Sequence, residues 1–237
     1  MNKKLLMGLV YIYISIVALS AETITSLGVT FPIMKLLKAD TFTAECSNPL
    51  HSDWDKDVPK DFFDDYKISG VQGTVKVRHI FDNQFVLGAD FDIGQARLKY
   101  DGSSNGLAKY TAMNLDLTLG YAAVDAERFT LIFSAIFGLQ HAKANLGSGD
   151  FDSISHYGYT ENATERYTAF EFGGELFMNF RIGDCFGLFA SCKLTYDIGN
   201  LRDEYPGKGS SGCDPKETFH KTTAFVVKPS VGVSFTF

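Results

Sequence analysis

The sequence has little proline and tryptophan, no excess of positive charge, and no second long apolar run. Its 237 residues include 6 Pro and a single Trp, and 28 acidic residues against 22 basic ones give a net charge of -6. An acidic balance argues against nucleic-acid binding. No apolar run long enough for a membrane helix follows the N-terminal segment, and the mean hydropathy is only -0.02, so the pattern also argues against a helical membrane protein.

The N-terminal segment has the features of a secretory signal peptide. Lys3 and Lys4 precede an apolar run from Leu5 to Leu19, and small residues follow this run. We therefore expect a signal peptide at residues 1–21, cleaved after Ala21 or after Ser20, and one domain at residues 22–237. A retained helical anchor is the alternative.

Phenylalanine and glycine are abundant, with 21 and 22 residues, and the apolar residues alternate with polar ones over long stretches. A period of two is the pattern of a β-strand with one apolar face. Eight strands are predicted, at about 26–37, 70–80, 85–100, 109–123, 128–141, 166–182, 185–199 and 221–237. In the third strand the alternation changes phase near Gly94, which predicts a β-bulge at Gly94 and Gln95.

The connections between these strands alternate in length. Those after the first, third, fifth and seventh strands are long or glycine-rich, whereas the other three are tight turns. Small outer-membrane barrels have short turns at one end and longer loops at the other. The sequence thus predicts an all-β fold, an eight-stranded antiparallel transmembrane β-barrel with up-and-down meander topology. A soluble sandwich or a lipocalin-type barrel is the alternative, but a sandwich has no reason to gather every long loop at one end.

The last strand carries the most specific resemblance. Its apolar positions are Phe225, Val227, Pro229, Val231, Val233, Phe235 and Phe237. With Phe235 and the final Phe237 it resembles the closing strand of bacterial outer-membrane β-barrels, which the assembly machinery reads. In architecture nearly the whole mature chain is similar to the eight-stranded families that include the OmpA membrane domain, OmpX, OmpW and the opacity proteins. The resemblance implies a bacterial outer-membrane location, with membrane lipid and the barrel-assembly machinery as partners.

Many charged residues occupy the polar phase of the predicted strands. They are Lys76, Arg78, Asp90, Asp92, Asp116, Glu171, Glu175, Arg181, Lys193, Asp197 and Lys228. Side chains fill a barrel of about eight strands, and buried carboxylates need partners, so we expect these charges to pair across strands. The turn near Asp82 predicts Lys76 beside Asp90 or Asp92. An ion-selective pore is the alternative.

The cysteines and the acidic first loop suggest further sites. The loops that carry Cys46 and Cys213 share a rim once the first and last strands meet, which suggests a Cys46–Cys213 disulfide; two free thiols are the alternative. Cys185 and Cys192 are about 23 Å apart along a strand and cannot bond to each other. The acidic run from Asp53 to Asp57 is similar in spacing to a calcium loop, but Val58 occupies the position that needs glycine. We expect no metal and no cofactor.

The sequence favours a surface role over an enzymatic one. His141 faces the lipid by phase, and Ser155 and His156 have no defined spacing of base and nucleophile, so no enzyme is expected. The leading hypothesis is a barrel whose loops 38–67, 142–165 and 200–220 contact host or environmental ligands, since rigid scaffolds carry variable functions on loops. The alternatives are a narrow channel for small or apolar solutes, as the OmpW resemblance implies, and an enzyme at the rim.

Overall fold

The computed structural model describes residues 22–39, 66–100, 108–146, 163–204 and 218–237. These residues form nine β-strands: β1 Glu22–Thr30, β2 Ile33–Ala39, β3 Tyr66–Ile80, β4 Phe85–Tyr100, β5 Ala108–Ala126, β6 Phe129–Leu146, β7 Ala163–Arg181, β8 Phe186–Glu204 and β9 Thr218–Thr236. None of the described residues belongs to a helix that is long and apolar enough to cross a membrane. The predicted signal peptide lies outside the described residues.

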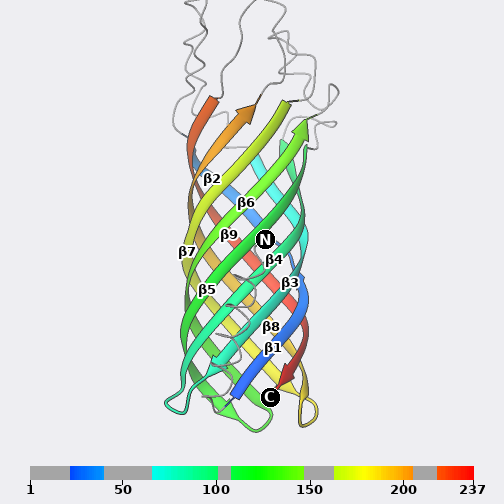
Figure 1. Cartoon of the computed structure of the whole chain (residues 1–237), viewed down its shortest axis with the longest axis vertical. Coiled ribbons are helices and arrows are strands. Elements are labelled where there is room, and N and C mark those ends of the chain that lie inside the picture. Colours follow the sequence, from blue (N-terminus) through cyan, green and yellow to red (C-terminus); the bar gives the residue numbers. More distant parts are fainter. Residues whose placement is uncertain (1–21, 40–65, 101–107, 147–162, 205–217) are drawn as a thin grey trace, which may run out of the picture.

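The strands form one closed antiparallel barrel (Figure 1). Both β1 and β2 pair with β3 on one side and with β9 on the other, so together they act as a single barrel strand. Pro32 interrupts this strand because it lacks an N–H group. The ladder nevertheless continues, since the amide of Phe31 donates to the carbonyl of Pro229 (2.9 Å) and the amide of Gly70 donates to that of Pro32 (3.2 Å). The predicted eight-stranded meander is confirmed.

The predicted β-bulge at Gly94 and Gln95 is wrong. β4 pairs with both β3 and β5 in unbroken register through these two residues. The outward side of β4 becomes polar at Gln95 and Arg97, whereas the inward Ala96 is buried. The outward side becomes polar here because β4 passes beyond the apolar part of the outer surface. The alternation of inward and outward residues does not change. Register shifts occur between Ala122 and Val124 and between Leu36 and Lys38 instead.

A broad belt of exposed apolar side chains surrounds the barrel. On β5 it includes Leu115 and Leu117, which are 55% and 61% exposed. From Met113 to Tyr121 the outward positions of β5 cover about 27 Å along the strand, or about 21 Å along the barrel axis at a tilt of about 40°. An outer-membrane barrel needs an apolar band about 25 Å tall. So large an apolar surface on a closed barrel is suited to lipid and not to water.

The barrel interior has three layers. An apolar layer near the tight turns consists of Ile24, Ile80, Val86, Ala122, Ile132, Phe177 and Phe189. A second apolar layer, toward the long connections, consists of Met34, Ala96, Tyr110, Ala112, Ala142, Ala144, Tyr167, Ala169, Ala224 and Val226. The buried charges occupy the strand positions between these two layers.

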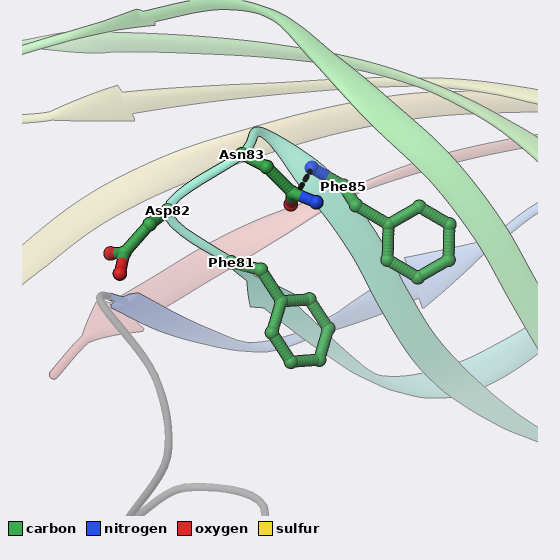
Figure 2. Close-up of a pocket in the computed structure, with 4 residues that line it drawn as sticks. All are labelled: Phe81, Asp82, Asn83 and Phe85. Atoms are coloured by element: carbon green, nitrogen blue, oxygen red, sulfur yellow. Dashed lines mark hydrogen bonds between the residues drawn. The ribbon is translucent and has the colours of Figure 1, made fainter.

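The turn between β3 and β4 closes one corner of the barrel (Figure 2). The amide of Gln84 donates to the carbonyl of Phe81 (2.8 Å), and Gln84 has a positive φ of 64°. The side chain of Asn83 accepts from the amide of Phe85 (3.1 Å). Phe81, Asp82, Asn83 and Phe85 line a hollow on this surface, and Figure 2 shows the Asp82 carboxylate pointing away from the two rings. The hollow lies at the turn, apart from the buried charges.

The barrel closes at a seam of small residues between β1 and β9. Gly28 and Gly232 are directly paired across the seam. A Cβ atom on either glycine would collide with a backbone carbonyl of the other strand, that of Val231 or Leu27, and would also meet the ring of Phe189. The ring therefore covers a place where the two strands approach too closely for any side chain.

We predict that Gly232→Val prevents closure, because the added side chain has no space against the backbone of β1. The mature protein, refolded in detergent, should lose the difference in gel mobility between unheated and heated samples. Gly73→Val is the matched control: a Cβ there would meet only the carbonyl oxygen of Ile93, at 3.7 Å. Normal heat-modifiability of Gly232→Val would contradict the assignment of the seam.

Candidate functional site

The barrel interior holds a group of buried charged side chains. Ten of the charged residues predicted to face inward are at most 4% exposed: Lys76, Arg78, Asp90, Asp92, Asp116, Glu171, Glu175, Lys193, Asp197 and Lys228. Strand alternation places them, since each occupies the same phase as its inward neighbours on β3, β4, β5, β7, β8 or β9. Arg181 is the exception: it lies at the end of β7 and pairs with Glu22 and with Asp125 (3.5 Å) at the turn end.

Asp90 is the centre of the network. Arg78 donates to it from both Nη1 (2.5 Å) and Nη2 (3.0 Å), in the bidentate geometry typical of strong arginine–carboxylate pairs. The Nζ atoms of Lys76 and Lys193 also lie 3.1 Å and 2.7 Å from Asp90 Oδ2. The turn between β3 and β4 thus brings Lys76 beside Asp90, at directly opposed positions of the ladder.

Two sets of ion pairs cross the full width of the lumen. Lys76 and Arg78 of β3 both contact Glu175 of β7, with a distance of 2.9 Å from Lys76 Nζ to Glu175 Oε1. Lys193 of β8 contacts Asp90 of β4. In the closed order of eight barrel strands, β3 and β7 are opposite each other, and so are β4 and β8. We call these two sets of ion pairs the braces. Asp90 connects them, because it contacts Lys193 of the second set and also Lys76 and Arg78 of the first.

A second part of the network lies closer to the long connections. Lys193 Nζ also lies 2.5 Å from Asp116 and 3.5 Å from Asp92, and Asn114 donates to Asp116 (2.8 Å). Lys228 pairs with Glu171 at 2.5 Å. These contacts join β5 and β9 to the strands of the braces, so that six of the eight barrel strands contribute a charge.

The described interior holds more carboxylates than cations. Six buried carboxylates face four buried cations. Asp197 forms no ion pair with any described residue and accepts a hydrogen bond from Thr195 (3.4 Å). One oxygen each of Asp116, Glu171 and Asp197 has no hydrogen-bond partner within the described part of the chain. The described part of the lumen therefore has two more acidic side chains than basic ones.

The network also rests on the apolar layer below it. The guanidinium carbon of Arg78 lies 5.4 Å from the centre of the Phe177 ring, which stacks on Phe189 at 5.7 Å. A cation over an aromatic face is attracted by the ring. Phe177 was not among the residues predicted to have a role. The available signal was its position in the strand: Phe177 lies two residues from both Glu175 and Asn179, so it faces inward with them on β7.

The remaining candidate residues do not join this site. Cys46 and Cys213 lie outside the described residues, while Cys185 and Cys192 are free thiols. His79 is hydrogen-bonded to Thr23 (3.0 Å), and His141 on the outer surface is hydrogen-bonded to Thr168 (3.0 Å). No group of three or more His, Cys, Asp or Glu residues in the described ranges has the arrangement of a metal site.

The last two aromatic residues lie at the closing seam. Phe235 packs edge-on against Phe186 with the ring centres 5.8 Å apart. Phe237 exchanges two backbone hydrogen bonds of 3.0 Å with Thr23, which forms the last rung between β9 and β1. That these aromatic residues also act as the assembly signal stays a prediction.

We predict that the double substitution Lys76→Ala and Arg78→Ala raises ion conductance. It leaves Asp90 and Glu175 short of partners, which typically costs about 3–5 kcal/mol for a buried pair, and it removes two long side chains from the lumen. Planar-bilayer recording of the refolded protein provides the measurement. Lys35→Ala with Arg97→Ala removes the same two residue types from the outer surface and should leave conductance unchanged. A silent and fully folded Lys76/Arg78 double variant would contradict the bracing role.

Comparisons with known proteins identify the fold. No family model matches the sequence, and no curated protein sequence matches it. The structure is similar to OprG from Pseudomonas aeruginosa, with a TM-score of 0.56 and 11% identity over 92% of this chain and 96% of that one. Ail of Yersinia pestis gives a TM-score of 0.45 and 15% identity over 92% and 99% of the two chains. OmpT, the outer-membrane protease from Escherichia coli, gives 0.38 and 10% over 91% and 96%.

At such identities the likeness shows the fold alone. The closed barrel, the apolar belt and the short turns at one end agree with it. The protein therefore has the fold of the small bacterial outer-membrane β-barrels, and its outer surface is that of a protein embedded in the outer membrane.

Proposed function

We propose that the protein is a sealed outer-membrane barrel that presents surface loops for contact with host or environmental ligands. The observation that carries this proposal is the pair of braces across the lumen, β3 to β7 and β4 to β8. All the side chains that form these braces are 0% exposed. A lumen blocked by paired charges gives solutes no open path, so the function must lie on the surface.

The arrangement of the connections supports this proposal. Residues 40–65, 101–107, 147–162 and 205–217 all join strands at one end of the barrel, whereas tight turns join them at the other. Short turns are periplasmic in small outer-membrane barrels, so the long connections belong to the cell surface. Loops on a rigid scaffold are the usual carriers of binding function.

A narrow channel for small or apolar solutes is the second candidate. The layer toward the long connections favours it, because six of its ten inward residues are alanine and fill less of the lumen than larger side chains do. The excess of two carboxylates in the charged layer would then select cations. The two candidates differ in whether solutes pass the braces.

We predict that liposomes containing the refolded mature protein take up neither potassium ions nor a small apolar solute faster than empty liposomes do. The reason is the continuous ion pairing across the lumen. Liposomes that contain an open general porin serve as the positive control, and heat-modifiable gel mobility verifies folding. Uptake of either solute by the wild type would overturn the sealed barrel and favour the channel.

We further predict that replacing residues 40–65 and 147–162 by short Asn-Gly turns lowers bacterial adhesion to cultured epithelial cells several-fold. The barrel itself should persist, because the strands and the seam are unchanged. Asp184→Ala, at the opposite end, is the control and should leave adhesion unchanged. Equal adhesion by cells with the shortened and the full loops would reject the loop-presenting role.

A further inference from the structure

A row of directly opposed residues carries carboxylates across one side of the lumen. From β3 to β8 it consists of Lys76, Asp90, Asp116, Gly138, Glu171 and Asp197. Like charges at directly opposed positions of a sheet destabilise each other, and the row contains two such pairs. Asp90 and Asp116 are bridged by Lys193, whose Nζ lies 2.7 Å and 2.5 Å from them. Glu171 and Asp197 have no such bridge, since Asp197 forms no ion pair with any described residue and accepts its hydrogen bond from a threonine.

Gly138 leaves a gap in the middle of this row. It opposes Asp116 on one side and Glu171 on the other. A Cβ atom on Gly138 would collide with Asp116 Oδ1, so the carboxylate of Asp116 extends over β6 toward β7. Lys193 lies 2.5 Å from Asp116 Oδ2, and Lys228 lies 2.5 Å from Glu171 Oε2. The other oxygens, Asp116 Oδ1 and Glu171 Oε1, are buried and have no hydrogen-bond partner among the described residues.

Two amide oxygens beside the gap provide an observation that does not depend on the acids. Asn114 and Gln140 oppose each other on β5 and β6, in the next inward row toward the long connections. They are 2% and 7% exposed, and neither Asn114 Oδ1 nor Gln140 Oε1 has a partner within the described ranges. The amide nitrogen of Asn114 donates to Asp116 Oδ2 (2.8 Å), which holds this amide beside the carboxylate. Buried oxygens of this kind require a donor or a cation.

We call Asp116 Oδ1, Glu171 Oε1, Asn114 Oδ1 and Gln140 Oε1 the oxygen cluster. All four oxygens accept hydrogen bonds and none donates while the two acids are ionised. Hard cations take carboxylate and amide oxygens of this type as ligands. The described lumen has two more acidic side chains than basic ones, and one divalent cation balances this surplus. A neutral water molecule would leave the repulsion along the row uncompensated.

We propose that the oxygen cluster binds a hard divalent cation, of the calcium type, inside the barrel. Calcium and magnesium complete their coordination with water where the protein supplies only some of the oxygens. Only two of the four oxygens belong to acidic residues, so the cluster is a different arrangement from the groups of three or more His, Cys, Asp or Glu that are absent from the described ranges.

The proposal goes beyond loop presentation, because the cluster lies in the lumen. The inward positions of β6 carry no charged side chain in its described part. A cation held by Gln140 together with Asp116 and Glu171 would join β6 to the charged network on β5 and β7.

Native mass spectrometry of the mature protein, refolded in detergent, tests the proposal. After refolding with calcium the folded wild type should retain one calcium ion, and after treatment with EDTA it should retain none. Calcium should also raise the midpoint temperature of the heat-modifiable gel shift by several degrees, because a ligand that binds only the folded state stabilises that state. Retention of magnesium in its place would support the same divalent site. Equal stabilisation by potassium at matched ionic strength would overturn it.

Shape-preserving variants locate the ion. Gln140→Met removes one oxygen of the cluster and should weaken calcium binding about tenfold. Asp116→Asn removes a negative charge and should weaken it further. Thr118→Val is the matched control, since it also removes a buried oxygen that has no partner in the described part of the chain. Thr118 Oγ1 lies over Gly88 of β4, away from β6, so calcium binding should not change.

Wild-type calcium affinity in the folded Gln140→Met and Asp116→Asn variants would overturn the proposal and would place the ion elsewhere, such as on the acidic run from Asp53 to Asp57. A folded wild type that retains neither calcium nor magnesium would overturn it as well. Neither result depends on solute uptake or on adhesion, so the failure of this site and the failure of the sealed, loop-presenting barrel can be told apart.

Discussion

The rest of the structure depends on the ion pairs that Asp90 makes with Arg78, Lys76 and Lys193 in the centre of the lumen. Charges removed from water are stable only where partners meet them. Because these partners come from opposite sides of the barrel, the network ties β3, β4, β7 and β8 to one register. A slip by one residue would turn the bases toward lipid, at a cost of about 2–4 kcal/mol for each Lys or Arg near the bilayer midplane. The buried charges thus specify the barrel as well as fill it.

The barrel separates two environments, and its side chains follow the boundary between them. Within the membrane the outer face is apolar and the inner face is charged, but beyond the apolar belt the arrangement reverses. On β4 this reversal is visible in the buried Ala96 between the exposed Gln95 and Arg97. The same boundary accounts for the apolar layers inside both ends of the barrel, which lie on either side of the charged layer. The height of each residue along the axis therefore decides which face is apolar.

The sequence was sufficient for the strands, their phase and the local pairing of Lys76 with Asp90, because alternation and a tight turn are properties of neighbouring residues. It was not sufficient for Lys76 with Glu175 or Lys193 with Asp90, since the stagger of the closed barrel decides which side chains meet across the lumen. The apparent bulge at Gly94 arose from assuming that one face stays apolar along a whole strand. Arg181 has the inward phase, yet it lies too near the turn end to join the network, and phase alone does not encode that height.

The interior and the exterior of the barrel perform different tasks. Ion pairs on the inside hold opposite strands together, and in the proposed sealed barrel they also close the path for solutes. The outside is apolar over the height that faces lipid, and tight turns join the strands at one end, so the proposed surface role falls to the long connections at the other end.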